Sequence, residues 1–138
     1  MRCSEIMKAD VECLRRDETI RKAAERMRDL NIGFLPICDE NGNVLGTLTD
    51  RDIAVRAVAG GMELDTQVLD VMSNEVVACD PSDDVDRAAE LMSERRKSRI
   101  MCIDEEGHLA GVISLSDIAQ QQDAGKTLRD VAEREVHA

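Results

Sequence analysis

Aromatic side chains are almost absent from this sequence of 138 residues. Phe34 is the only aromatic residue, and the chain contains neither tryptophan nor tyrosine. Because 43% of the residues are nevertheless hydrophobic, the core must be built from valine, isoleucine, leucine, alanine and methionine. The length suits one compact domain.

Long hydrophobic runs are absent as well. The apolar stretches end after about five residues, whereas a membrane-spanning helix needs about 20. The N-terminus carries charges at Arg2, Glu5 and Lys8, which does not fit a signal peptide. We therefore expect a soluble, cytoplasmic protein with no membrane partner.

The chain also lacks a surplus of positive charge. Its 29 acidic and 18 basic residues give a net charge of −11, which repels phosphate backbones and anionic lipids. The short basic run Arg95-Arg96-Lys97 fits the end of a helix, where cations interact favourably with the helix dipole. We expect no nucleic-acid partner.

No two cysteines form a C-x-x-C pair. The five cysteines are Cys3, Cys13, Cys38, Cys79 and Cys102. Because they stand singly and three of them lie in apolar runs, we expect buried, reduced thiols. The two histidines, His108 and His137, add no credible ligand set to these scattered thiols, so no metal site is expected.

Motifs for catalysis are missing in the same way. The sequence has no Gly-rich Walker loop with its lysine, no nucleophile elbow and no Cys–His pair at a plausible spacing. Carboxylate pairs are abundant among 29 acidic residues, so no single pair is informative without geometry. We expect a protein that is not an enzyme and has no cofactor.

What the sequence does contain is an internal repeat. A shift of 65 positions (Gly111 minus Gly46) aligns two stretches of about 48 residues without a gap. Met7 then falls on Met72, and Asp52 on Asp117. Each copy is too short to bury much apolar surface alone, which predicts that the copies pack on each other around a pseudo-two-fold axis.

The hydrophobic periodicity changes in the same order in both copies. A short apolar strand (11–14 and 76–79) leads to a cap candidate, Asp17 or Ser82, and then to an amphipathic helix. A hairpin follows, with strands at 34–38 and 44–48 in the first copy and at 100–103 and 109–113 in the second. A second helix begins around Asp50 or Leu115, so each copy is predicted to be β-α-β-β-α.

The repeat also gives the expected domain boundaries. The first copy occupies 6–62 and the second 63–123, with a short linker helix at about 65–72. A helical tail follows at 124–138, with its helix at 127–136. The exits of the two second helices are marked by glycine at Gly60-Gly61 and Gly125.

The junction between hairpin and second helix is the most specific motif. It reads Gly46-Thr47-Leu48-Thr49-Asp50-Arg51-Asp52-Ile53 in the first copy and Gly111-Val112-Ile113-Ser114-Leu115-Ser116-Asp117-Ile118 in the second. Both copies resemble the cystathionine-β-synthase (CBS) motif, with its pattern G-h-h-[ST]-x-x-[DN]. The chain, over roughly residues 6 to 122, is therefore similar to a stand-alone CBS pair. The resemblance implies an α/β fold of two motifs packed sheet to sheet, with two symmetry-related clefts.

The junctions also indicate a nucleotide site on physical grounds. A hydroxyl followed three residues later by a carboxylate lies near a helix N-terminus, where free N–H groups and the dipole attract phosphate. Thr49 and Ser114 can hydrogen-bond phosphate, and Asp52 and Asp117 suit the two hydroxyls of a ribose. The alternative is that the same residues only cap their helices.

The resemblance further implies that each cleft combines residues of both copies. Around Thr49 and Asp52 it places Val77, Ser98, Arg99 and Ile100; around Ser114, Ser116 and Asp117 it places Glu12, Gly33, Phe34 and Leu35. Arg99 occupies the place from which a basic side chain reaches the phosphate in many CBS pairs. The alternative for Arg99 is a surface arginine paired with a nearby acid.

The first copy departs from that pattern, because Gly33-Phe34 stands where the second copy has Ser98-Arg99. Glu12 is a further departure, since an uncompensated carboxylate opposes phosphates. We therefore expect unequal sites, with the better one at Asp52. Arg51 is either a second phosphate cation or an exposed residue of the helix start.

These observations predict a regulatory sensor of AMP, ADP or ATP that acts on an unknown effector protein or through its own dimer. CBS pairs commonly dimerise through their helices, so we expect a homodimer with Met27, Leu30, Leu91, Met92 and the second helices as contact faces. Two alternatives stay open. The first alternative is a ligand-independent regulatory scaffold, and the second is a divalent-cation sensor that uses its acidic surface.

Overall fold

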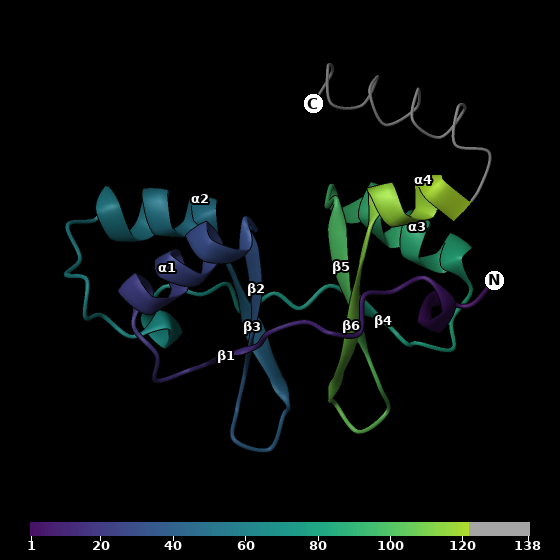
Figure 1. Ribbon diagram of the computed structural model, residues 1–138, viewed down its shortest axis with the longest axis horizontal. Helices are drawn as coiled ribbons and strands as arrows, with labels where there is room; N and C mark the ends of the chain where they lie inside the picture. Colours follow the sequence, from purple (N-terminus) through teal and green to yellow (C-terminus); the bar gives the residue numbers. More distant parts are fainter. Residues whose placement is uncertain (122–138) are drawn as a thin grey trace. The chain divides into compact units, whose positions relative to one another are not determined.

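The computed structural model describes residues 1–121 and divides them into two compact units (Figure 1). The first unit is Glu12–Val76, and the second joins Met1–Val11 to the residues from Val77 onward. The N-terminal segment is therefore part of the unit that contains the second repeat. The predicted tail helix at 127–136 and the helix exit at Gly125 lie outside the described residues.

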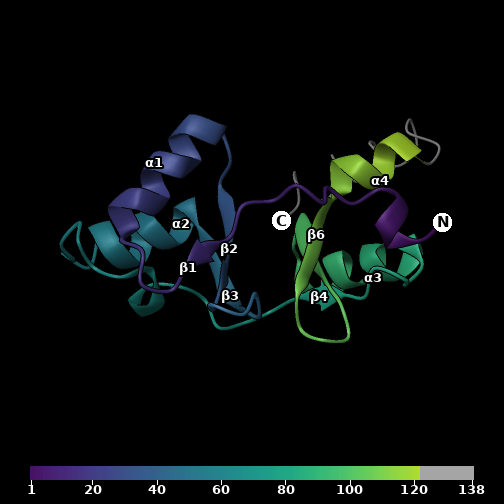
Figure 2. The ribbon, with the colours of Figure 1, turned by 60° about the horizontal axis from the view of Figure 1, so that its bottom comes forward.

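The first unit is a three-stranded sheet covered by helices on one face (Figure 2). The strand order is β1-β2-β3, with β1 parallel to β2 and β2 antiparallel to β3. Its elements are β1 (Leu14–Arg15), α1 (Ile20–Leu30), β2 (Phe34–Cys38), β3 (Val44–Thr49), α2 (Asp50–Asp52), η2 (Ile53–Val58) and the 3₁₀-helix η3 (Val68–Asp70).

The second unit repeats this arrangement in the order β4-β5-β6. Its elements are the 3₁₀-helix η1 (Cys3–Glu5), β4 (Ala78–Cys79), α3 (Val85–Arg95), β5 (Arg99–Ile103), β6 (Leu109–Ser114) and α4 (Leu115–Gln121). The predicted mixed α/β fold with a β-α-β-β-α order in each copy is confirmed. Among the described residues, no helix is long and apolar enough to cross a membrane.

The first helix of each unit begins two residues later than the sequence indicated. Thr19 caps α1 by accepting a hydrogen bond from the Lys22 N–H at 3.2 Å, and Asp84 caps α3. The predicted caps, Asp17 and Ser82, are wrong. They lie in the preceding turns, where the Ser82 hydroxyl donates to Asp80 Oδ1 at 2.6 Å.

The outer strands are shorter than predicted. The sequence favoured strands at 11–14 and 76–79, whereas β1 contains only Leu14–Arg15 and β4 only Ala78–Cys79. The ladder is short, because β1 pairs with β2 at Ile37 and Cys38 alone. The hairpin strands β2, β3, β5 and β6 agree with the prediction to within one residue at each end.

Each unit has its own hydrophobic core. The core of the first unit consists of Leu14, Ile20, Ala23, Met27, Leu35, Ile37, Leu48, Ala57, Val68, Val71 and Met72. The core of the second consists of Cys3, Cys79, Val85, Ala88, Met92, Ile100, Cys102, Ile113 and Ile118. Met27 and Met92 are thus buried in their own units, and the prediction that they form a dimer interface is wrong.

The second helix differs between the units. In the second unit it is the regular helix α4. In the first unit, α2 lasts one turn and continues as a π-helix over Ile53–Val58, in which the Ala59 N–H donates to the Ala54 carbonyl at 3.0 Å. The predicted α-helix from Asp50 is therefore confirmed only for its first turn. It ends near Gly61, whose φ of +71° favours glycine.

Candidate functional site

The junction between β3 and α2 in the first unit is a reciprocal cap. The Asp52 N–H donates to Thr49 Oγ1 at 3.0 Å, and the Thr49 N–H donates to Asp52 Oδ2 at 3.0 Å. Both side chains are only partly exposed. This arrangement satisfies two of the N–H groups that a helix start leaves without partners.

The junction between β6 and α4 in the second unit has the same geometry. The Asp117 N–H donates to Ser114 Oγ at 3.1 Å, and the Ser114 N–H donates to Asp117 Oδ2 at 3.0 Å. The sequence-based interpretation that these residues cap their helices is therefore correct. Capping uses one oxygen of each carboxylate and leaves the proton of each hydroxyl free to be donated.

The two carboxylates differ in their remaining neighbours. Asp52 Oδ1 lies 4.0 Å from Arg56 Nε, and Arg56 is also held by the carbonyl oxygens of Val71 and Met72. Within the described part of the chain, Asp117 forms no ion pair. The corner at Thr49 and Asp52 therefore already contains a cation, and the corner at Ser114 and Asp117 does not.

The glycine of each junction motif has a packing role. A Cβ at Gly46 would lie 2.3 Å from the Ser73 carbonyl oxygen, and a Cβ at Gly111 would lie 2.7 Å from that of Lys8. In both units the neighbouring segment is bridged to the strand, because Thr47 exchanges backbone hydrogen bonds with Ser73. The repeated glycine is thus explained by packing and does not by itself indicate a ligand.

The start of the central strand lies beside the junction in each unit. Phe34 is directly opposite Thr49 in the first sheet, and Arg99 is opposite Ser114 in the second. The Ser98 carbonyl accepts a hydrogen bond from the N–H at the start of α4, at 2.9 Å. Residues 33–34 and 98–99 therefore lie at the same sheet edge as the capped corner of their own unit.

Arg99 is an available cation at this end of the second sheet. Its side chain is exposed at the beginning of β5, and it makes no hydrogen bond or ion pair with any residue from 1 to 121. The alternative of a surface arginine paired with an acid is therefore not what the described residues show. Ser98 is also exposed, whereas Ile100 is only 1% exposed and belongs to the core.

The other predicted site residues have varied surroundings. Arg51 and Ser116 are exposed in the first turns of their helices, and Val77 is half-buried against the second core. Glu12 lies 3.9 Å from Arg26, whose shorter contact is with Glu18, so the charge of Glu12 is only partly compensated. The expected grouping of Arg99 with Asp52 joins residues of different units and stays a prediction.

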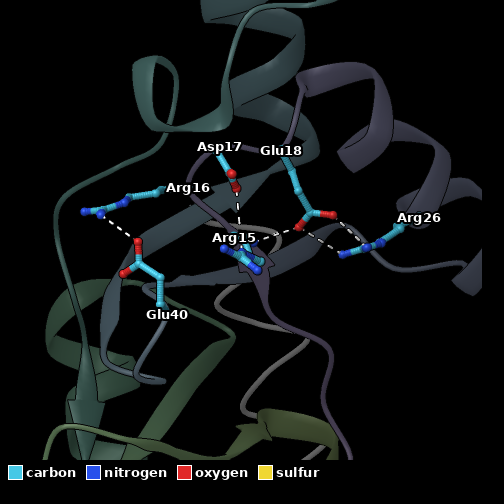
Figure 3. Close-up of polar contacts among 6 residues, drawn as sticks. All are labelled: Arg15, Arg16, Asp17, Glu18, Arg26 and Glu40. Atoms are coloured by element: carbon cyan, nitrogen blue, oxygen red, sulfur yellow. Dashed lines mark hydrogen bonds and ion pairs between the residues drawn. The ribbon is translucent and has the colours of Figure 1, made fainter.

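The connection between β1 and α1 contains a second polar group (Figure 3). Arg26 donates to Glu18 at 2.7 Å, and Glu18 also accepts from the Arg15 N–H at 2.7 Å. Arg16 contacts Glu40 at 2.9 Å. Since each of these arginines faces a carboxylate, the group is a set of internal ion pairs and leaves no cation for an anionic ligand.

Both repeats match one known domain family. The family model of the CBS domain matches residues 3–58 and 68–123. The chain belongs to the CBS domain family. It carries two CBS motifs in tandem, and the first segments of the two motifs are exchanged, because residues 3–11 belong to the second unit and residues 68–76 to the first.

Similar CBS proteins match nearly the whole chain. The CBS domain-containing protein YhcV of Bacillus subtilis is 34% identical over 135 residues, which is 95% of each chain. The crystal structure of Hypoxic Response Protein I with two coordinated zinc ions has 31% identity and a TM-score of 0.80, covering 87% of this chain and 98% of that one. The CBS domain protein PAE2072 from Pyrobaculum aerophilum, complexed with AMP, has 25% identity and a TM-score of 0.79, covering 96% and 99%.

The cysteines are where sequence reasoning missed a grouping. Cys3, Cys79 and Cys102, which we interpreted as scattered thiols, converge in the second CBS unit, with all three sulfur atoms within 4.8 Å of one another. Cys13 and Cys38 are neighbours in the first unit, with a sulfur–sulfur distance of 2.9 Å. All five are free thiols, as expected. Sequence spacing gave no signal for the first group, because Cys3 reaches Cys79 only when the N-terminal segment docks in the second unit.

Proposed function

We propose that this CBS pair is a regulatory module that binds an adenosine nucleotide such as AMP, ADP or ATP and is not itself an enzyme. The observation that carries the proposal is the pair of hydroxyl–carboxylate corners at helix starts, next to an exposed arginine without a partner. Both corners offer acceptors for a ribose and donors for a phosphate. The complex of PAE2072 with AMP supports the choice of ligand.

Arg99 is the proposed phosphate ligand. A guanidinium donates two parallel hydrogen bonds to phosphate oxygens, and such charge-assisted bonds are worth about 1.5–3 kcal/mol. Its counterpart in the first unit is Phe34, which cannot donate. We therefore propose one strong and one weak nucleotide site, with Asp52 in the strong site by the cross-copy arrangement that the family resemblance implies.

The nucleotide would act by binding one arrangement of the module more tightly than another. The change would reach an effector protein or a second copy of the chain. Leu30, Val55 and Val58 are large apolar side chains that remain exposed on the helices of the first unit, at 48%, 54% and 70%. Leu30 and the second helix were among the predicted contact faces, and without the buried Met27 and Met92 they remain the proposed dimer contact.

Calorimetric titration of AMP and ATP tests the proposal. We expect Arg99→Gln to weaken binding by about 10- to 100-fold, because tenfold corresponds to 1.4 kcal/mol. Lys97→Gln is the matched control, since Lys97 is exposed and lies two residues away with the same charge. Asp52→Asn is preferable to alanine, because asparagine keeps an acceptor for the Thr49 N–H and preserves the cap.

The partner of Arg99 follows from two double-mutant cycles. If Arg99 and Asp52 hold the same nucleotide, their effects on the binding free energy will not be additive, while Arg99 and Asp117 will act independently. The reverse coupling would place the site within the second unit. Unchanged binding in both Arg99→Gln and Asp52→Asn would remove the assignment.

Thermal denaturation separates this function from the alternatives. A ligand at 100 times its dissociation constant adds about 2.7 kcal/mol of stability, which a shift in Tm reveals. AMP, ATP, NAD and S-adenosylmethionine are each tested, and magnesium and zinc are tested alone because a relative contains zinc. No shift with any nucleotide would favour the scaffold, and a shift with magnesium but with no nucleotide would favour the divalent-cation sensor that uses the acidic surface.

A further inference from the structure

Three cysteine thiols meet inside the second unit. Cys3 comes from η1, Cys79 from β4 and Cys102 from β5. Their side chains are buried, with exposed fractions of 0%, 6% and 0%. The sulfur of Cys79 lies 3.5 Å from that of Cys3 and 3.7 Å from that of Cys102. Three separate segments of the chain therefore deliver sulfur atoms to one point.

The sulfur separations fit a common metal ion. Zinc binds thiolate sulfur at about 2.3 Å in tetrahedral sites, so two sulfurs on one ion lie about 3.8 Å apart. The observed separations of 3.5 and 3.7 Å are close to this value, and all three sulfurs lie within 4.8 Å of one another. Small rotations of the three side chains are enough to bring the sulfur atoms to the separation that one ion requires.

The equivalent positions of the first unit contain aliphatic side chains. A shift of 65 residues places Cys3 on Val68, Cys79 on Leu14 and Cys102 on Ile37. Val68, Leu14 and Ile37 are all 0% exposed and belong to the first core.

The backbone around the two positions is the same. The Val68 N–H donates to the Glu18 carbonyl at 2.8 Å, and the Cys3 N–H donates to the Asp83 carbonyl at 2.8 Å. The fold therefore needs only apolar volume here, and the second unit has replaced all three aliphatic side chains with metal-binding ones.

The charges around the cluster also favour a cation. Asp83 lies close enough for its negative charge to raise the pKa of Cys3 and Cys79, after the larger effects of burial and of the neighbouring thiols. Its counterpart Glu18 is neutralised by Arg26, but the position equivalent to Arg26 is Leu91. Burial raises the pKa of the Cys3 thiol to about 12.

We propose that Cys3, Cys79 and Cys102 form a binding site for one soft, thiolate-preferring cation, Zn²⁺ or Cu⁺. Each thiol that becomes a ligand releases its proton to solvent, so that up to three protons are exchanged for one ion. The ion links η1 to β4 and β5 and thereby fixes the N-terminal segment to the second sheet. The site involves none of the proposed nucleotide ligands, so the two proposals stand or fall separately.

The test is the metal content of the full chain, refolded under reducing conditions with Zn²⁺ or with Cu⁺. We expect about one ion per chain. The decisive variant is the triple substitution Cys3→Val, Cys79→Leu, Cys102→Ile, which installs the aliphatic side chains of the first unit. Because that core already exists in the same fold, the variant is expected to fold and to lose the ion.

The matched control is Cys13→Ala with Cys38→Ile, which installs the residues found at 78 and 103 in the second unit. This variant also loses thiols, but we expect it to keep the ion. Cobalt is a second probe, since thiolate ligands give Co²⁺ an intense sulfur-to-metal charge-transfer band. The band should appear in the wild type and the control, and be absent from the triple variant.

Chelator competition measures the strength of the site. Cys79→Leu alone should weaken metal binding by at least about 100-fold, because it removes a direct ligand. The proposal is overturned if the refolded wild type binds neither Zn²⁺ nor Cu⁺. It is equally overturned if the triple variant binds as much metal as the control. It is also overturned if the reduced wild type gives no charge-transfer band with Co²⁺.

Discussion

The two CBS units have the same backbone hydrogen bonds at the strand–helix junction and at the first segment, but different side-chain chemistry at equivalent positions. Both have a reciprocal cap at the strand–helix junction and a glycine pressed against a neighbouring carbonyl. They differ where the first unit has Val68 packed in its core and the second has Cys3, and where the first has Phe34 and the second Arg99. Shared residues therefore satisfy the backbone, whereas the proposed metal ligands and the proposed phosphate-binding arginine stand at positions that differ.

The largest expected effect tests the shared part of this comparison. Gly46→Ala would place a Cβ 2.3 Å from the Ser73 carbonyl oxygen, which cannot retreat without breaking the Thr47–Ser73 bridge. We expect a loss of about 3 kcal/mol in the free energy of unfolding, measured with urea. Gly111→Ala should cost about 2 kcal/mol, because its Cβ would lie 2.7 Å from the nearest carbonyl oxygen, that of Lys8, and so overlaps less with the backbone. Equal stability of both variants and the wild type would contradict the packing role.

The next effect tests a difference between the units. Arg26→Leu copies Leu91 and leaves the Glu18 carboxylate, which is 20% exposed, without its cation. We expect the free energy of unfolding to fall by about 1 kcal/mol. Arg21→Leu is the control, because the Arg21–Glu25 pair is far more exposed and should contribute less. If both substitutions have the same effect, the ion pair in Figure 3 is not a stabilising difference.

A smaller effect compares the thiols of the two units. The Cys38 S–H donates to Cys13 Sγ at 2.9 Å and lowers the pKa of Cys13, whereas burial raises the pKa of Cys3. Since the thiolate is the nucleophile, iodoacetamide should modify Cys13 first. Cys38→Ala should slow that reaction by about three- to tenfold, as followed by peptide mass spectrometry. Faster labelling of Cys3 than of Cys13 would reverse the comparison.

The smallest effect concerns acid stability. Backbone N–H groups of Asn43 and Asn41, and then the charge of Arg16, hold the pKa of Asp39 below its usual value. A lowered folded-state pKa stabilises the fold above the unfolded-state pKa of about 3.9, and this stability is lost as the pH falls through the folded-state value. Asp39→Asn should therefore flatten the loss of stability below about pH 4 in urea titrations. An unchanged acid limb would show that Asp39 does not contribute.

Much of this fold could be predicted because local patterns decide it. The spacing of Ile20, Ala23 and Met27 indicated one buried face, and α1 buries those residues. The acidic turn at Asp39 gave the hairpin, because its carboxylate accepts the N–H groups of residues 41 and 43. The helix caps were predicted two residues too early. Several short polar side chains precede each helix, and only the backbone path selects one of them as the cap.

The remaining features depend on contacts between distant parts of the chain. The π-helix over Ile53–Val58 has no sequence signal that we can identify. The meeting of Cys3 with Cys79 requires the N-terminal segment to dock on the second sheet, which spacing alone cannot show. The corner residues were correctly placed at helix starts, but their grouping into a site with Arg99 depends on the relative positions of the units and stays a prediction.

The exchange of first segments has a consequence for dissecting the protein. A fragment cut at the repeat boundary, such as 3–58, would lack η3 and with it the buried side chains of Val68 and Val71. The continuous stretch Glu12–Val76, by contrast, contains every member of its core. During synthesis of the full chain, this stretch is complete before the ribosome has made β4, β5 and β6, the strands of the unit to which η1 belongs.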